Sequence, residues 1–381
     1  AFVQRRSHPD PATFVGRGKV DEVREAVIAL AADTVIADGE LDPAQLRNLE
    51  DRLQVKVIDR TGLILDIFAQ HAKSTEGKAQ VELAQLQYLR QRLRGWGGNL
   101  SRQAGGRAAA GAGIGGRGPG ETKIETDRRR IKTRISILRR RLRDMDAVRA
   151  TKRAERRRNA VPSVAIVGYT NSGKSSLLNR LTGAGVLVQD ALFATLDPTT
   201  RRSQTSDGRV FTLTDTVGFV RNLPHDLVEA FRSTLEESVE ADLLLHIVDA
   251  SDADPAGQIM AVRTVLAEIG ATGVPEQLVF NKCDLVDDAR IVELRTLDAT
   301  ALFVSARTGD GIDELLVRLE ERLPRPQAEV RALIPYSRGD LIDRIHRVGE
   351  FVSSEHTADG TLVVARVNAD LAGELAPYLA P

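Results

Sequence analysis

The sequence is poor in cysteine and in long apolar runs, and it carries no net charge. Its one cysteine, Cys283, excludes an internal disulfide bond and is typical of a protein from the reducing cytoplasm. No apolar run reaches the roughly 18 residues that a membrane-spanning helix needs. The chain also lacks an initiator methionine and begins Ala1-Phe2-Val3, so we expect residues ahead of Ala1, including a strand of the first domain.

The zero net charge conceals a strong asymmetry along the chain. Residues 128–158 hold 15 lysines and arginines against 3 acidic residues, so this segment is basic while the remainder is acidic. Such a segment suits a polyanionic partner, which the rest of the chain would avoid. With 381 residues, and about 100–200 residues in a usual domain, we expect two to four domains.

Residues 1–72 alternate short strands with helical segments. Strands are expected at 34–38 and 55–59, and helical periodicity fills the intervals before, between and after them. The alternation predicts a small N-terminal α/β domain of βαβ units with a parallel sheet. The run Gly16-Arg17-Gly18-Lys19 lacks the full spacing of a phosphate-binding loop, and we interpret it as a turn that precedes a helix.

Residues 73–160 predict an antiparallel helical hairpin with a glycine-rich loop at 97–120. Apolar residues at heptad-like spacings form a narrow stripe in each arm, which favours a hairpin, although a globular helical bundle stays open. The stripe of the first arm is Leu86, Leu89, Leu93 and Trp96. The stripe of the second arm is Ile124, Ile131, Ile135, Leu138, Leu142 and Met145.

The loop at the tip of this hairpin contains eight glycines between residues 105 and 120 and no acidic residue. Such a run cannot pack a core by itself, so it is either a linker or a loop that becomes ordered against RNA. We favour RNA because the second arm is the basic segment, and because no motif that reads a DNA groove occurs. The predicted RNA contacts are Arg107, Arg117, Arg128, Arg129, Arg130, Arg139, Arg140 and Arg141.

A buried strand, a turn and a helix follow one another in residues 161–182, VPSVAIVGYTNSGKSSLLNRLT. Between strand and helix lies Gly168-x-x-x-x-Gly173-Lys174-Ser175, the pattern of a phosphate-binding loop. Glycines let backbone N–H groups close around phosphate oxygens, and the helix N-terminus adds a positive dipole end. Lys174 can reach the β- and γ-phosphates, and the Ser175 hydroxyl can ligate Mg²⁺.

Two later segments supply further groups for a nucleoside triphosphate. The loop 193–197 can fold over the γ-phosphate, with Thr195 as the second hydroxyl on Mg²⁺. The strand at 210–214 leads into Asp215, which would hold a metal-bound water, and into Gly218, whose N–H could bond the γ-phosphate and sense its loss.

Two more segments select the base. Asn281-Lys282-Cys283-Asp284 follows a strand, and the Asp284 carboxylate can accept both the N1–H and the exocyclic amine of guanine, a pair that adenine lacks. Ser305 and Ala306, which we expect on the final strand, can close over the base. The ordered series predicts a guanine-nucleotide-binding domain with a doubly wound sheet at 161–324.

Phe219 and Asn171 refine this prediction. Phe219 follows Gly218 at the position where Ras-like GTPases carry a water-positioning Gln, so we expect slow unaided hydrolysis and can name no catalytic residue. Asn171 lies within the phosphate loop, as in potassium-activated GTPases, and either helps to hold K⁺ or stabilises the loop.

Residues 325–381 follow a proline-rich boundary at 324–326 and predict a small α+β module. Strands are expected at 330–334, 349–354 and 362–367, and helices at 341–346 and 371–379, which gives a βαββα order. The sequence does not indicate the function of this module.

Several segments are more specific than the nucleotide motifs alone. They are PDPATFVGRGKVDEV, GRGPGETKIETDRRRI, GYTNSGKSSLLNRLTG, LFATLDPTTRR, DTVGFVRNLPHDLVEAFRSTLEE, NKCD and SARTGDG. With them the chain resembles the HflX family of bacterial GTPases, most specifically over residues 1–324. The resemblance implies nucleotide contacts by Gly168, Tyr169, Thr170, Asn171, Ser172, Gly173, Lys174, Ser175, Phe193, Ala194, Thr195, Leu196, Asp197, Asp215, Thr216, Val217, Gly218, Asn281, Lys282, Cys283, Asp284, Ser305, Ala306 and Arg307.

The resemblance also implies an activity and its partners. It implies GTP hydrolysis with GTP/GDP and Mg²⁺, stimulated by the large ribosomal subunit, and separation of stalled 70S ribosomes into subunits during a stress response. The glycine-rich hairpin would reach rRNA near the peptidyl transferase centre. We expect a cytoplasmic monomer. Two alternatives stay open: a GTPase of ribosome assembly or RNA modification, and a nucleotide-sensing RNA-binding protein with little turnover.

Overall fold

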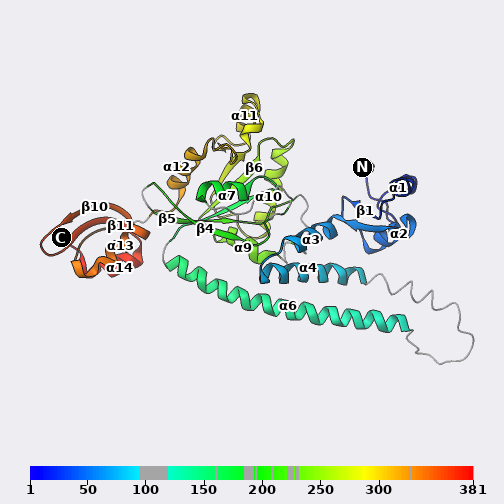
Figure 1. Cartoon of the computed structure of the whole chain (residues 1–381), viewed down its shortest axis with the longest axis horizontal. Helices are drawn as coiled ribbons and strands as arrows, with labels where there is room; N and C mark the ends of the chain where they lie inside the picture. Colours follow the sequence, from blue (N-terminus) through cyan, green and yellow to red (C-terminus); the bar gives the residue numbers. More distant parts are fainter. Residues whose placement is uncertain are drawn as a thin grey trace, which may run out of the picture. The chain divides into compact units, whose positions relative to one another are not determined.

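The structure of the chain is a computed structural model, which describes residues 1–93, 119–158, 161–183, 193, 195–206, 209–220, 227, 231–325 and 328–380. The described residues form two compact units, which divide between Met145 and Asp146 inside a long helix. The first unit contains an α/β region and most of a helical hairpin. The second contains a six-stranded sheet with its helices and a small α+β module (Figure 1).

The N-terminal region is the small parallel α/β unit that the sequence predicts. Strands β1 and β2 pair in parallel, with Thr34 opposite Lys56, and Val20, Leu49 and Val57 lie in the core that the helices close over them. The elements are α1 (Arg17–Ala29), β1 (Thr34–Ala37), α2 (Pro43–Leu53), β2 (Lys56–Asp59) and α3 (Arg60–His71).

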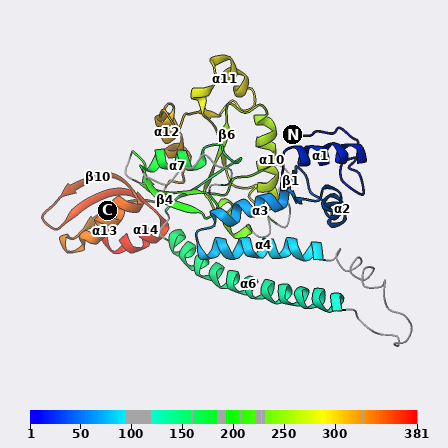
Figure 2. The ribbon, with the colours of Figure 1, turned by 45° about the vertical axis from the view of Figure 1, so that its right-hand side comes forward.

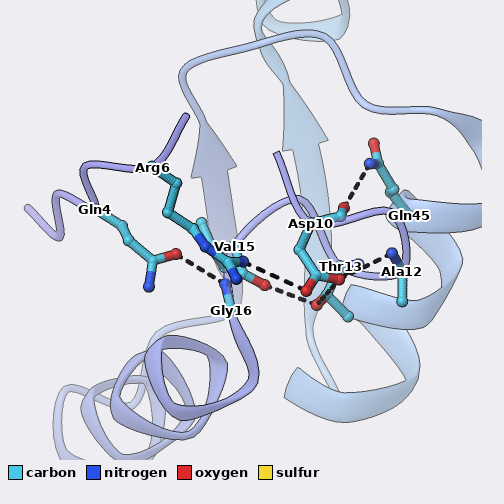
Figure 3. Close-up of polar contacts among 8 residues, drawn as sticks. All are labelled: Gln4, Arg6, Asp10, Ala12, Thr13, Val15, Gly16 and Gln45. Carbon is cyan, nitrogen blue, oxygen red and sulfur yellow. Dashed lines mark hydrogen bonds and ion pairs between the residues drawn. The ribbon is translucent and has the colours of Figure 1, made fainter. Parts of the chain in front are cut away.

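A tight loop ahead of α1 is held by hydrogen bonds at several points (Figure 3). Asp10 and Phe14 exchange both backbone hydrogen bonds, at 2.9 Å each. Gln4 Oε1 accepts from the Gly16 amide at 2.8 Å, and Gln45 Nε2 of α2 donates to the Asp10 carbonyl at 2.9 Å. Gly16 therefore ends a turn before a helix, as predicted, and its amide already has an acceptor.

The hairpin consists of α4 (Thr75–Leu93) and α6 (Pro119–Arg158), which run antiparallel and side by side in both views (Figures 1 and 2). Arg134 on α6 donates to both carboxylate oxygens of Glu82 on α4, at 2.6 and 2.8 Å. The buried apolar seam between the helices is formed by Ala79, Leu83, Ile135 and Leu138, with Leu86, Ile131 and Leu142 packed against it.

Two details of the predicted hairpin are wrong. Leu89 is 48% exposed, because the stripe that meets α6 passes through Ala79 and Leu83 on another face of α4. Pro119 and Gly120, predicted as the end of the loop, begin α6; proline suits the first turn of a helix because its missing N–H would be unpaired there anyway. Trp96 and most of the glycine-rich loop lie outside the described residues.

The second unit is built on a sheet with the order β4-β5-β3-β6-β7-β8, in which β4 is antiparallel and the other pairs are parallel. Its strands are β3 (Ser163–Gly168), β4 (Thr199–Gln204), β5 (Val210–Asp215), β6 (Leu243–Asp249), β7 (Glu276–Asn281) and β8 (Leu302–Phe303). Its helices are α7 (Lys174–Thr182), α9 (Arg232–Val239), α10 (Pro255–Glu268), the 3₁₀ turn η1 (Cys283–Leu285), α11 (Asp288–Arg295) and α12 (Ile312–Arg322).

Helices cover both faces of this sheet, as the doubly wound prediction requires. Leu177 of α7 and Leu315 of α12 share one core with Ile166 of β3. Ile259 of α10 and Leu294 of α11 share another core with strands β6 and β7. The carboxyl ends of the parallel strands therefore meet at one edge, where an open α/β sheet binds its ligands.

The C-terminal module has the predicted βαββα order. Its antiparallel sheet has the order β10-β11-β9, and Leu341, Ile345 and Leu371 pack on it. The elements are β9 (Ala328–Ile334), η2 (Tyr336–Arg338), α13 (Gly339–Val348), β10 (Glu350–His356), β11 (Thr361–Val367), α14 (Ala369–Leu375) and η3 (Ala376–Tyr378).

Candidate nucleotide site

The predicted phosphate loop joins β3 to α7 at the carboxyl edge of the sheet. Gly173 has φ = 91°, and a Cβ atom there would lie 2.2 Å from Asn281 Nδ2, so only glycine fits. Asn171 has φ = 60° and is exposed, a conformation that asparagine tolerates better than most residues. The helix begins at Lys174, so its first amides face the loop, as anion binding requires.

Lys174 is almost fully buried beneath this loop. Its Nζ donates to the Tyr169 carbonyl at 2.8 Å. Burial lowers the pKa of Lys174 to about 8, and the nearby Asp215 carboxylate opposes the shift. A Cβ atom on Gly218 would lie 3.2 Å from this ammonium, so the missing side chain leaves room beside Lys174 for a phosphate oxygen.

Three oxygen-bearing side chains that the sequence assigned to the metal converge next to the loop. Ser175 Oγ lies 2.8 Å from Thr195 Oγ1 and donates to Asp215 Oδ2 at 2.5 Å. Thr195 Oγ1 donates to the same carboxylate oxygen at 3.0 Å. Asp215 Oδ1 is buried and has no hydrogen-bond partner among the described residues, and burial raises the pKa of Asp215. Two hydroxyls and a carboxylate fit the oxygen preference of Mg²⁺, and the buried Oδ1 can accept from a water bound to such an ion.

Phe219 belongs to the hydrophobic core. Its side chain is fully buried, and its backbone pairs with the phosphate loop: its carbonyl accepts from Thr170 N at 2.8 Å and its amide donates to the Gly168 carbonyl at 3.1 Å. The ring therefore has no access to a water at the γ-phosphate position. The residue after Gly218 anchors the loop, whereas the sequence indicated only that it is not a Gln.

Asn281 and Asp284 lie at the end of β7, where the base was predicted. Asn281 connects two loops, because its Nδ2 donates to the Ser172 carbonyl at 2.8 Å and its Oδ1 accepts from Ala306 N at 3.0 Å. Asp284 accepts from Ser305 Oγ at 2.6 Å and pairs with Arg307. The hydrogen bond from Ser305, with the charge of Arg307, lowers the pKa of Asp284, so the carboxylate is ionised and able to accept from guanine.

Several predicted contacts use their side chains for structure. Thr216 Oγ1 donates to the Ile166 carbonyl at 2.8 Å, and Cys283 Sγ lies 3.2 Å from the Phe280 carbonyl. Burial raises the pKa of Cys283 to about 11, which keeps the thiol protonated. The side chains that are buried in this way are Phe193, Leu196, Thr216 and Val217. These positions can offer a nucleotide only their backbone, and Ala194 lies outside the described residues.

One prediction about the site differs from the structure, and two residues of the site were not predicted. Ser305 and Ala306 do not lie on β8, because this short strand ends at Phe303. They lie two and three residues beyond its end. Asp249 and Arg180 were not predicted: Asp249 Oδ2 pairs with Lys282 Nζ at 2.7 Å, and Arg180 of α7 donates to the Thr308 carbonyl at 2.7 Å. Asp249 could have been found as an acid at the carboxyl end of a buried strand, whereas nothing in the sequence distinguishes Arg180.

The predicted RNA contacts on α6 are surface residues. Arg129, Arg130, Arg139, Arg140 and Arg141 are exposed, and Arg128 is half-buried. Arg107 and Arg117 lie outside the described residues. Within the part of the chain that the structure describes, no helix is long and apolar enough to cross a membrane.

The phosphate loop, the oxygen cluster and the Asn281–Asp284 segment define the six-stranded sheet and its helices as a P-loop GTPase domain. Family models match three consecutive regions: "GTP-binding GTPase N-terminal" over residues 1–69, "GTP-binding GTPase Middle Region" over 71–156 and "50S ribosome-binding GTPase" over 163–282.

Full-length relatives agree with these matches. GTPase HflX of Lacrimispora saccharolytica is 46% identical over 374 residues, which cover 98% of this chain and 86% of the relative. GTPase HflX of Escherichia coli is 48% identical over 360 residues, which cover 94% and 83%. The chain belongs to the HflX family and is a GTP-binding GTPase. A GTP-binding protein from Sulfolobus solfataricus in complex with GDP is similar over 83% of this chain and 88% of that chain, with 25% identity and a TM-score of 0.44.

Proposed function

We propose that this GTPase binds the large ribosomal subunit and separates stalled ribosomes into subunits. The observation that carries the proposal is the combination of a GTP switch with a continuous basic helix of 40 residues, α6, on which the arginines at 129–130 and 139–141 are exposed. The description of the matching family model, a 50S ribosome-binding GTPase, supports the same partner. Because the partner is the ribosome, the site of action would be the cytoplasm.

Two of the four segments would carry out separate tasks. Residues 161–324 bind and hydrolyse GTP, and residues 73–160 reach rRNA near the peptidyl transferase centre through the glycine-rich tip. Residues 1–72 and 325–381 flank them. Exposed arginines on α6 would neutralise rRNA phosphates, and glycines at the tip would permit close approach of the backbone.

In the nucleotide site, we assign the phosphates to the amides of 168–175 and to Lys174, and the guanine base to Asp284. Mg²⁺, when bound, would balance the phosphate charge, and Ser175, Thr195 and a water on Asp215 would hold it. We also expect, as a separate prediction, that K⁺ binds near Asn171. Since Thr195 and Gly218 belong to the two segments expected to contact the γ-phosphate, GTP would hold both segments in place, and its hydrolysis would release them.

Hydrolysis without the ribosome should be slow, because Phe219 is buried and presents no polar group to a water. The binding of GTP would be sufficient for splitting, and hydrolysis would serve release. The test compares GTP turnover with and without purified large subunits in K⁺ buffer, and subunit separation with GTP and with a non-hydrolysable analogue. If large subunits left GTP turnover unchanged and the protein did not co-sediment with them, the ribosomal partner would be rejected. The alternative of a GTPase in ribosome assembly or RNA modification would then be favoured.

A further inference from the structure

A half-open cavity of about 560 Å³ lies within the first unit, lined by residues of α2, β2, α3 and α4. Its walls are largely apolar and include Leu46, Val57, Leu65, Tyr88 and Leu89. Small-molecule sites in proteins typically occupy about 300–1,000 Å³ and combine apolar walls with a few polar groups. The cavity shares no residue with the nucleotide site, and nothing in the GTPase mechanism uses it.

One cation in the wall of this cavity has a buried nitrogen without a partner among the described residues. Arg47 of α2 lines the cavity, and its Nη2 atom is buried without a hydrogen-bond acceptor among the described residues. An unpaired guanidinium nitrogen in a low-dielectric site is costly, and an anion that accepts from it would remove the cost. The unpartnered nitrogen therefore indicates a ligand with an anionic group.

The other charges around the cavity are engaged or exposed. Arg92 Nη2 pairs with the buried Asp59 carboxylate at 2.5 Å, and the Arg92 guanidinium stacks on Tyr88. Glu50 Oε1 accepts from Val57 N at 3.2 Å, and Lys56 and Asp66 are exposed to solvent. Among the charged wall residues that the structure describes, Arg47 is thus the one with a buried nitrogen that lacks an acceptor.

The contact between Glu50 and Val57 also decides the kind of ligand. Among the described residues, strand β2 pairs with β1 alone, so its other edge could accept an extended peptide as a third strand. Glu50 already occupies the Val57 amide on β2, which such a peptide would need. A compact molecule is favoured over a peptide strand.

We propose that this cavity is a second ligand site, which binds a small molecule with an apolar body and one anionic group held by Arg47. The ligand would contact α2 on one side and α4 on the other. It would therefore stabilise the junction between the α/β region and the first arm of the hairpin, where Tyr88 Oη donates to Asp59 Oδ1 at 2.5 Å. The proposal does not depend on the ribosomal function.

The test uses two fluorescent probes that differ in charge. 8-Anilinonaphthalene-1-sulfonate has an apolar body and one sulfonate, and N-phenyl-1-naphthylamine has the same body without the charge. Both are titrated into the full chain with the nucleotide site saturated by GDP. We expect one saturable site per chain that binds the sulfonate about tenfold more tightly than the neutral probe, the usual size of a hydrogen bond to a charged group.

Three variants show whether this preference comes from the cavity. Arg47→Met should abolish the preference and leave the neutral probe bound, while Arg47→Lys should retain most of it. Leu89→Trp, at the exposed rim, should weaken both probes. Arg24→Met, which removes an exposed arginine of α1, is the matched control and should change neither affinity.

A thermal measurement separates binding from folding. Because Arg47 Nη2 is unpaired, Arg47→Met should not lower the unfolding temperature without ligand, whereas the sulfonate should raise it more in the wild-type chain than in Arg47→Met. A wild-type chain without saturable binding, or an Arg47→Met chain with an unchanged preference for the sulfonate, would overturn the proposal. If Arg47→Met failed to fold, a loss of the preference in Arg47→Lys would overturn it as well, since the cation would still be present.

Discussion

The nucleotide site and helix α6 use polar residues in opposite ways. In the site, Lys174, Asp215 and Asn281 are at least nine-tenths buried, and the groups that hydrogen-bond to Asp215 and Asn281 come from distant segments. Along α6, the arginines at 129–130 and 139–141 are exposed to solvent, and a narrow seam of apolar residues attaches the helix to α4. The comparison teaches that the site depends on exact atomic positions, whereas α6 depends on the number and sign of its charges.

The largest effect is expected when a Cβ atom is added to the phosphate loop, where the site has no room for it. Gly173→Ala should lower GDP affinity at least about a hundredfold, because its Cβ atom would collide with Asn281 Nδ2 and its φ of 91° disfavours any side chain. Gly183→Ala is the matched control: φ there is 63°, but a Cβ atom meets nothing within 4 Å. It should cost about 1 kcal/mol of stability and leave affinity unchanged. Titration with a fluorescent GDP derivative distinguishes them, and equal affinities would contradict the steric argument.

The next prediction concerns the seam that holds the hairpin together. Leu138→Ala should destabilise the first unit by about 2–4 kcal/mol, since Leu138 is 1% exposed between α4 and α6. Ile137→Ala, one residue away and 47% exposed, should cost less than about 0.5 kcal/mol. Hydrogen exchange of α4 and α6 measures both. GDP affinity should stay unchanged in each variant, and a parallel loss of affinity would mean that the two regions are not independent.

A third prediction tests whether charge alone serves the ribosomal partner proposed above. Replacing Arg139, Arg140 and Arg141 with Gln should weaken large-subunit binding about tenfold or more. The slope of log affinity against log salt concentration should fall by the equivalent of about two to three phosphate contacts. Intrinsic GTP turnover should not change. Three Gln substitutions at Arg295, Arg318 and Arg344, outside the hairpin, provide the control. Binding lost equally in both triple variants would indicate a general effect of net charge.

The smallest effect is expected at the ion pair across the hairpin. The hydrogen bond from Arg134 lowers the pKa of Glu82 below its usual 4.5, so the pair stabilises the folded chain above that pH. The contribution is lost as the pH falls through the folded pKa. Because both side chains are partly exposed, Glu82→Gln should cost less than about 1 kcal/mol at pH 7.

Denaturation curves at several pH values test this dependence. The difference between Glu82→Gln and the wild type should shrink as the pH drops below 4.5, where the wild-type carboxylate becomes protonated. A difference that stayed constant down to pH 3 would show that the side chain matters for packing and not for its charge.

Much of the fold could be predicted because its signals are local. Buried strands of the second unit are continuous apolar runs, and Gly173 and Lys174 mark the start of α7 by their order alone. The hairpin was predicted from heptad spacing, but the choice of face was partly wrong. The spacing of apolar residues identifies an apolar stripe on a helix. It cannot tell whether Leu89 or Leu83 meets the second helix, because that depends on what covers the other side of α4.

The sequence by itself determined the nucleotide specificity, the order of the elements and the position of the basic helix, because each depends on residues that are close in the chain. Only the tertiary structure decided what Phe219, Arg180 and Arg47 do. Phe219 is buried and pairs with the phosphate loop, Arg180 reaches the loop after β8, and Arg47 is left without a partner beside a cavity. These roles depend on segments that are distant in sequence, and a side chain acquires a partner or lacks one only when such segments pack together.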